Sequence, residues 1–153
     1  MIDFHSHILP NIDDGSRGME ETLNLIQEAK EVGFTKIIST SHYMEDYCEA
    51  NEFERKMLLD NVQKQDKEIE LFLGSEIYIS DEMVSFLQDK EASTINHSRY
   101  VLFELPMNMK PFNGKEMVYR LIENGYIPII AHPERYHYVQ KDLDYVKELA
   151  EMG

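Results

Sequence analysis

The chain has 153 residues, of which 42% are hydrophobic and 10% aromatic, a composition typical of one soluble globular domain with a sizeable core. Its formal net charge of −14 argues against a protein that grips nucleic acid, because phosphate contacts need clustered lysines and arginines. The single cysteine, Cys48, excludes an internal disulfide framework and a zinc site built from several cysteines.

Short β-like runs alternate with amphipathic helical stretches along the whole chain. In chain order, the predicted elements are a strand at residues 2–5, a helix at 19–32, a strand at 36–40, a helix at 53–67, a strand at 70–73, a helix at 81–88, a strand at 100–104, a helix at 114–124, a strand at 127–131 and a helix at 143–150. This alternation predicts βαβ units and a parallel sheet, either open or closed into a barrel.

Local signals set the bounds of several predicted elements. Gly33 and Gly125 each follow a helical pattern and precede an aromatic residue and a strand, as expected of helix-ending glycines. Ser80 is available to cap the helix at 81–88, and Pro128 should lie near a strand start, where a missing N–H matters least. In the weaker helix at 53–67, the predicted apolar side consists of Phe53, Met57, Leu58 and Val62.

The end of the chain repeats part of this pattern of helix, glycine, aromatic residue and strand. Residues 149–153, LAEMG, begin the same pattern of helix end and glycine. We therefore expect a C-terminally truncated domain whose next strand is missing. The alternative is that Gly153 simply caps a terminal helix.

Residues that commonly bind metals follow or end every predicted strand. They are His5 and His7 at the first strand, His42 at the second, Glu76 at the third, Glu104 at the fourth and His132 at the fifth. In parallel α/β folds the carboxyl ends of the strands share one face. The sequence therefore predicts that these six side chains converge on a metal site.

The residue types indicate the chemistry of that site. Histidines two residues apart on an extended segment share a side and can approach one cation. Imidazole and carboxylate ligands without thiolates suit Mn²⁺, iron or Zn²⁺, and a multinuclear cluster can activate water for attack on a phosphate ester. Arg135 is placed for bidentate contact with a phosphoryl group, although a surface arginine is the alternative. Glu76 and Glu104 each have the alternative of a salt-bridged structural acid, and either Asp13 or Asp14 offers a further carboxylate.

The motifs DFHSHILPNIDDG, TSH, GSEIYI, SRYVLFELP and GYIPIIAHPERY resemble, in order, those of the PHP (polymerase and histidinol phosphatase) superfamily. They are most similar to its bacterial tyrosine-protein phosphatases of capsule and exopolysaccharide synthesis, the CpsB/YwqE type. The resemblance implies a TIM-like (β/α)₇ barrel, here incomplete with about five parallel strands, and up to three divalent metal ions, with Mn²⁺ preferred over iron or Zn²⁺.

The resemblance also assigns roles to individual residues. It implies that His5 and His7 bind a first metal, that Glu76 bridges it to a second held by Glu104 and His132, and that Asp14 and His42 hold a third. Asp14 is preferred to Asp13 only on this ground, and Arg135 would bind the phosphate. The family carries a late Asp-x-His motif, but no such motif follows His132 in this chain. We therefore expect an incomplete site.

Three functions fit these residues. The first is a metal-dependent protein-tyrosine phosphatase that uses a metal-bound hydroxide and whose partner, by resemblance, is a bacterial tyrosine kinase of polysaccharide export. The second keeps the site but acts on small phosphate monoesters such as histidinol phosphate, or on nucleic-acid ends, which the negative charge disfavours. The third is a truncated, non-catalytic metal-binding or interaction domain.

The expected setting is the cytoplasm. No apolar run approaches the about 20 residues of a membrane span, and the first residues lack the basic start and apolar stretch of a signal peptide. We expect no direct membrane insertion and no nucleic-acid partner, and a homo-oligomer is compatible with the sequence.

Overall fold

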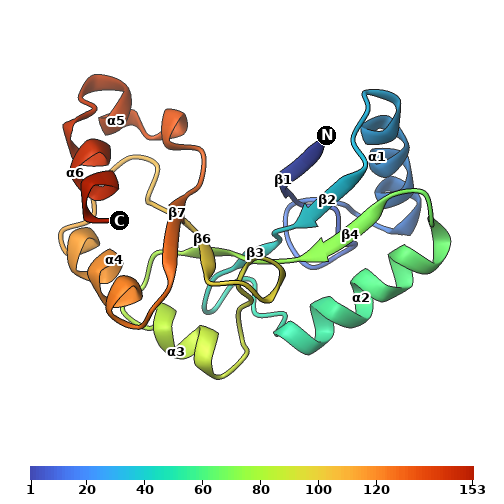
Figure 1. Cartoon of the computed structure of the whole chain (residues 1–153), viewed down its shortest axis with the longest axis horizontal. Helices are drawn as coiled ribbons and strands as arrows, with labels where there is room; N and C mark the ends of the chain where they lie inside the picture. The colour runs from blue at the N-terminus through green and yellow to red at the C-terminus, as the bar shows by residue number, and fades with distance from the viewer.

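The computed structural model describes all 153 residues as parallel strands with helices on their outer side (Figure 1). In chain order the elements are β1 (Ile2–Ser6), α1 (Met19–Glu31), β2 (Lys36–Ser39), β3 (His42–Tyr43), α2 (Glu52–Gln65), β4 (Glu70–Leu73), β5 (Glu76–Tyr78), α3 (Met83–Gln88), the 3₁₀ turn η1 (Ile95–His97), β6 (Tyr100–Glu104), α4 (Gly114–Glu123), β7 (Ile127–Ile130), the 3₁₀ turn η2 (Pro133–Arg135), α5 (His137–Lys141) and α6 (Asp144–Met152). None of these helices has the length and apolar character that a membrane crossing requires.

All strand pairs are parallel and follow the order of the chain. One sheet has the order β1-β2-β4 and the other has the order β3-β5-β6-β7. Because β3 directly follows β2 and β5 directly follows β4, the two sheets join into one curved layer, with β1 and β7 at its edges. The parallel α/β expectation is confirmed.

The sequence predicts five strands. In the structure, two of them, β2 and β4, are each followed by a bend and then by a further short strand. The breaks fall after Ser39 and after Leu73, where the backbone bends. The Glu76 N–H donates to the carbonyl oxygens of both Thr40 and Ser41 at 3.2 Å. This shared hydrogen bond takes the place of the single bond that a regular strand pair would form there. The bend places His42 and Glu76 at the starts of short strands, β3 and β5, which pair with each other.

Two hydrophobic cores pack between the strands and the helices, and we name the two parts of the molecule after them. In the first arm, formed by β1, β2, β4, α1 and α2, the core contains Ile26, Ile37, Leu59, Val62 and Leu71, among others. In the second arm, formed by β5, β6, β7 and α3 to α6, it contains Ile77, Phe103, Leu121, Tyr136 and Leu149, among others. Figure 1 shows the two arms on either side of an open concave face.

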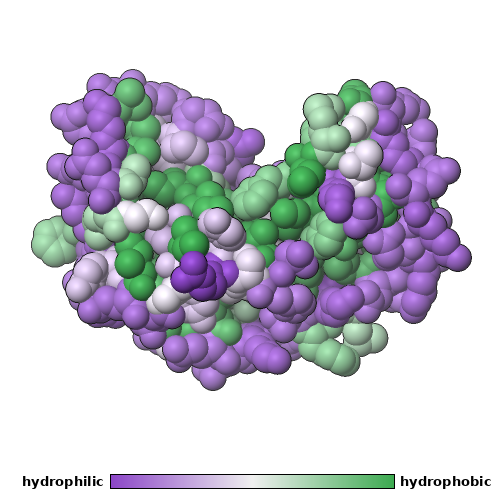
Figure 2. Space-filling model, in the orientation of Figure 1, coloured by the Kyte–Doolittle hydropathy of each residue, from purple (hydrophilic) through white to green (hydrophobic).

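The concave face is also partly hydrophobic, as Figure 2 shows between the two arms. Ile38 and Leu102 belong to a small third cluster there, together with Ala131. Their neighbours Ile37 and Phe103 pack against the helices, as the two-residue period of a strand requires. The strands are therefore apolar on both faces, which is typical of a buried parallel sheet.

The expected helix ends are confirmed for α1 and α4. Gly33 and Gly125 have φ angles of 93° and 83°, values that an L side chain rarely adopts. At Gly33 the N–H of Phe34 bonds to the carbonyl of Ala29, and that of Gly33 to Lys30. This pair of bonds is the Schellman pattern that closes a helix.

Two helix predictions are wrong in part. On α2, Phe53 and Met57 are 72% and 52% exposed, because the buried side of the helix is Arg55, Leu59 and Val62. Of these, Leu59 and Val62 belong to the first core. Helix α3 starts at Met83 with Glu82 as its N-cap. Ser80 does not cap it, because its hydroxyl accepts the Glu82 N–H in the preceding turn.

Pro128 behaves as expected. It is the second residue of β7, which lies at an edge of its sheet. An edge strand has one row of ladder groups without a strand partner, so the missing N–H of proline costs little there.

Candidate metal centre

A buried carboxylate, Glu76, lies at the centre of the predicted site. Its side chain is 1% exposed at the start of β5. One oxygen, Oε2, lies 3.0 Å from His7 Nε2, 3.3 Å from His42 Nδ1 and 3.5 Å from His5 Nε2. The other, Oε1, lies 2.7 Å from His132 Nε2. Four imidazoles from three parts of the chain therefore surround one carboxylate.

His5 and His7 reach this carboxylate from β1 and the residue after it. The register with β2 shifts between Asp3 and Ser6, so the strand bulges where His5 lies, and such bulges commonly redirect side chains near functional sites. The two rings stand 5.2 Å apart in an edge-on arrangement. As predicted from their spacing, both rings face one point.

The other nitrogen of each ring has its own partner. His5 Nδ1 lies 2.6 Å from the hydroxyl of Thr40, and His7 Nδ1 lies 2.8 Å from Asp13 Oδ2. Histidines that bind metals generally hold their second nitrogen in this way. Both rings are therefore arranged to offer Nε2 to a cation.

The remaining predicted ligands complete two neighbouring groups. Asp14 Oδ1 lies 3.6 Å from His42 Nε2 and 3.7 Å from His7 Nδ1. Glu104, at the end of β6, lies 3.8 Å from His42 Nδ1 and 3.6 Å from His132 Nε2. The structure thus brings all seven predicted ligands together, and three overlapping sets of them have ligand atoms within 4.8 Å of one another: His5, His7 and Glu76; His7, Asp14 and His42; and His42, Glu76 and Glu104.

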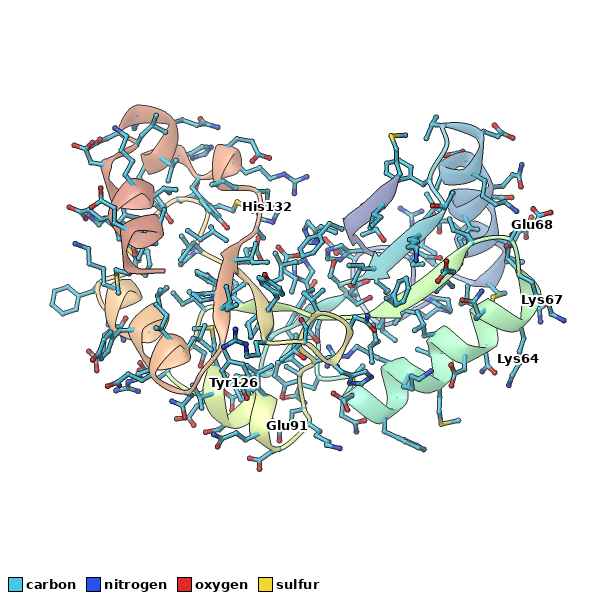
Figure 3. All side chains as sticks on the ribbon, in the orientation of Figure 1. Lys64, Lys67, Glu68, Glu91, Tyr126 and His132 are labelled. Atoms are coloured by element: carbon cyan, nitrogen blue, oxygen red, sulfur yellow. The ribbon has the colours of Figure 1, made fainter.

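His132 lies just beyond the end of β7 and faces the concave side (Figure 3). Its φ of 28° is unusual for a residue with a side chain, and such backbone strain persists only where the surroundings enforce it. The buried Tyr136 hydroxyl donates to the Ala131 carbonyl at 2.7 Å and accepts the Leu105 N–H at 3.0 Å. This tyrosine holds the segment around His132 against the end of β6.

The predicted phosphate-binding residue, Arg135, is exposed and lines the same cavity of about 430 Å³ as His5, His7, Asp14, His42, Glu76, Glu104 and His132. It makes no ion pair with any carboxylate of the chain. Its guanidinium is therefore available to an anion that enters the cavity, because no internal partner neutralises it.

The electrostatics of the cluster fit bound cations. Burial and the neighbouring Glu76 raise the pKa of Glu104, and no lysine or arginine pairs with either acid. Two adjacent buried carboxylates are costly unless a cation lies between them. The His132 Nδ1 atom is buried without a hydrogen-bond partner. The donor set of imidazoles and carboxylates is the one that Mn²⁺, iron and Zn²⁺ accept.

His7 responds most strongly to this environment. Burial alone disfavours its charged form, but hydrogen bonds to Asp13 and Glu76 outweigh burial and raise the pKa of His7 to about 9. Burial acts in the opposite direction on the acids, yet the bond to His7 lowers the pKa of both Asp13 and Glu76. Without a bound cation, the His7 imidazole therefore keeps its second proton to a higher pH than a free imidazole does.

Sequence reasoning did not identify Thr40 and left Asp13 as the less favoured of two acids. The only sequence signal for Thr40 is the hydroxyl-rich run Ser39, Thr40 and Ser41, all of which are fully buried. Cys48, which is not followed by the arginine spacing of a cysteine phosphatase, is buried, and burial raises the pKa of its thiol. It is a poor nucleophile here.

Comparisons with known proteins place these features in a family. The family model described as capsular polysaccharide synthesis, CpsB/CapC, matches residues 1–153. CapC of Staphylococcus aureus is 37% identical over 158 residues, which cover 100% of this chain and 62% of the relative. Tyrosine-protein phosphatase CpsB of Streptococcus agalactiae is 31% identical over 157 residues, with 100% and 65% covered.

A solved structure shares the fold. It comes from a study of YwqE from Bacillus subtilis and CpsB from Streptococcus pneumoniae, described as metal-dependent tyrosine phosphatases. The superposition has a TM-score of 0.92 at 30% identity and covers 100% of this chain and 64% of the other. This chain therefore spans somewhat less than two thirds of the length of the relatives it matches.

Proposed function

Because the chain belongs to the CpsB/CapC family of capsular polysaccharide synthesis, we propose that it carries most of the metal site of a metal-dependent protein-tyrosine phosphatase. Relatives that match the whole chain are named tyrosine-protein phosphatases, and the matching solved structure is described as metal-dependent. The curved layer of parallel strands then corresponds to part of a TIM-like (β/α)₇ barrel. The proposed role is in capsule or exopolysaccharide synthesis.

The observation that carries this proposal is the surroundings of Glu76. Both of its oxygens face imidazole nitrogens, at 2.7 Å on one side and at 3.0 to 3.5 Å on the other. A carboxylate that offers each oxygen to a different set of histidines is arranged to bridge two cations. A structural acid would instead pair with lysine, arginine or backbone N–H groups.

We assign the ligands to three ions of the Mn²⁺, iron or Zn²⁺ type, with Mn²⁺ preferred. His5, His7 and Glu76 would hold the first ion, Glu76, Glu104 and His132 would hold the second, and Asp14 and His42 would hold the third. The first of these assignments corresponds to a compact ligand group, and Asp14 and His42 share a second such group with His7. When bound, such ions activate water and neutralise charge on a phosphoryl group.

The residues of the chain itself bind and orient the substrate phosphate. Arg135 is exposed, free of internal carboxylate partners and on the wall of the cavity. A guanidinium in this position can hold two phosphoryl oxygens at once. Thr40 and Asp13 fix the rings of His5 and His7, so the ligand nitrogens need little rearrangement.

The proposed substrate is phosphotyrosine in a protein, and the proposed partner is a bacterial tyrosine kinase of polysaccharide export. The cavity is hydrophilic, with Met107 as its one apolar lining residue, and it opens to solvent beside an exposed arginine. A phosphorylated side chain on a protein surface can reach such a site. The net charge of −14 disfavours nucleic-acid ends as substrates.

The test combines metal analysis of the purified chain with hydrolysis of a phosphotyrosyl peptide, with and without added Mn²⁺. We expect bound metal and Mn²⁺-stimulated turnover, and we expect the double change His5→Ala and His7→Ala to abolish both. A surface histidine change, His97→Ala, is the control. Metal-free protein with no stimulated turnover would overturn the proposal, and so would full activity in the double variant.

A further inference from the structure

We propose that Asp13 is a positioning residue that fixes the ring of His7 and fastens it to the segment carrying His42. This inference rests on the proposed metal site. Asp13 is next to the proposed ligand Asp14, but the two carboxylates have different surroundings. The Asp14 side chain is 69% exposed at the cavity, whereas the Asp13 side chain is fully buried.

Three hydrogen bonds account for both oxygens of Asp13. Oδ2 accepts from His7 Nδ1 at 2.8 Å and from the His42 backbone N–H at 2.9 Å, and Oδ1 accepts from the Gly15 N–H at 3.0 Å. The carboxylate therefore joins the end of β1, its own loop and the start of β3. Asp13 does not line the cavity, whereas Asp14 does, so Asp14 is the better placed of the two acids to bind a cation.

The loop is shaped to bring Asp13 back to His7. A Cβ atom at Gly15 would lie only 2.2 Å from the His7 carbonyl oxygen, so only glycine permits this approach. The Ser16 N–H then donates to that same carbonyl at 3.2 Å. These backbone contacts hold the Asp13 carboxylate beside the His7 imidazole.

The chemical effect of Asp13 is on the choice of ring nitrogen. By accepting a proton from Nδ1, Asp13 leaves the Nε2 lone pair of His7 for a cation beside Glu76, 3.0 Å away. A carboxylate behind a histidine ligand also makes that ligand more basic. Loss of such an outer partner typically weakens metal binding about 10- to 100-fold.

Asp13→Asn tests this role with almost no change in size. An amide has one acceptor oxygen, so it cannot satisfy all three donors. In one orientation of the asparagine amide, its NH₂ group faces the Gly15 N–H. In the other orientation, it faces His7 Nδ1 and the His42 N–H. The exposed Asp60→Asn change on α2, in a surface pair with Lys56, is the matched control.

The measurement is Zn²⁺ affinity by competition with a chromogenic chelator, together with urea unfolding of each metal-free variant. We expect Asp13→Asn to bind Zn²⁺ about 10- to 100-fold more weakly than wild type and Asp60→Asn to match wild type. A purely structural role would lower the stability of Asp13→Asn without changing its Zn²⁺ affinity, and that result overturns the inference.

A second measurement needs no variant and therefore decides the matter even if Asp13→Asn does not fold. In the Zn²⁺-loaded wild-type chain, ¹⁵N NMR should find the His7 proton on Nδ1 and the metal on Nε2, and the opposite tautomer overturns the inference. A wild-type chain that binds no Zn²⁺ overturns the proposed function and this inference together. Equal affinities in wild type and Asp13→Asn overturn only the inference.

Discussion

The raised pKa of His7 makes the stability of the metal-free chain depend on pH. In the unfolded chain its imidazole has a pKa of about 6.5, whereas the folded chain raises it to about 9. The folded state therefore binds this proton more tightly. Its contribution to stability is fully present below about pH 6.5 and is lost as the pH rises through 9.

The size of the effect follows from the difference of about 2.5 pKa units, at about 1.4 kcal/mol per unit. Protonation of His7 stabilises the folded, metal-free chain by about 3 kcal/mol at pH 6, and by almost nothing at pH 9.5. The His7 ring is only 20% exposed, so solvent screens the interaction little. The lowered pKa values of Asp13 and Glu76 describe the same contacts and add nothing further.

The assay is urea unfolding in excess chelator at pH 6, 7.5 and 9.5, for wild type and for His7→Gln. Taking the difference between the two proteins removes the titration of Cys48, the tyrosines and other shared groups. We expect the stability advantage of wild type to shrink by about 3 kcal/mol between pH 6 and 9.5. An advantage that stays constant across this range would refute the assigned proton on His7.

Three further changes test separate parts of the site. Glu76→Gln should weaken Mn²⁺ binding, measured by calorimetry, by more than the roughly 100-fold expected for an outer partner, because it removes the proposed bridge. Arg135→Lys should lower kcat/KM for a phosphotyrosyl peptide about 10-fold or more without changing bound metal, because lysine cannot make the bidentate contact. Tyr136→Phe should lower the free energy of unfolding by about 1 to 3 kcal/mol, because the Leu105 N–H and the Ala131 carbonyl both lose a buried partner.

Each of these has an outcome that contradicts it. Unchanged Mn²⁺ affinity in Glu76→Gln would show that its carboxylate is not a ligand. Equal kinetics for Arg135→Lys and wild type would make Arg135 a surface residue. Wild-type stability in Tyr136→Phe would mean that water or a rearranged backbone satisfies both groups.

The strand ends were predictable because the sequence marks each one in two ways, by an apolar run and by the polar residue that ends it. At Glu104, for example, an apolar run that suits a buried strand stops at an acid, and the same change occurs at His132. In a parallel sheet these positions share one edge, so topology predicts that such residues converge. His42 and Glu76 reach the same place differently, because each lies at the start of a short strand after a bend. The metal roles themselves stay a prediction until binding is measured.

The contacts behind the ligands were not predictable in the same way. Nothing in the sequence distinguishes Thr40 from its serine neighbours, because its contact with His5 depends on the bend between β2 and β3. The direction in which the loop before Gly15 turns decides which acid contacts the back of His7 and which faces the cavity, and here these are Asp13 and Asp14, respectively. Similarly, the exposed Phe53 and Met57 follow helical spacing, but the direction in which α2 packs is set by β4.

The position of the candidate site between the two arms has a consequence for how the chain unfolds. Each arm has its own hydrophobic core, so each is able to act as a separate cooperative unit. His5 and His7 belong to the first arm, whereas Glu76, which completes their ligand group, begins β5 of the second arm. A cation held by ligands from both arms adds its binding free energy to any opening that separates them. Metal loading should therefore turn two loosely coupled unfolding transitions into one, and calorimetric melting with and without chelator would reveal this change.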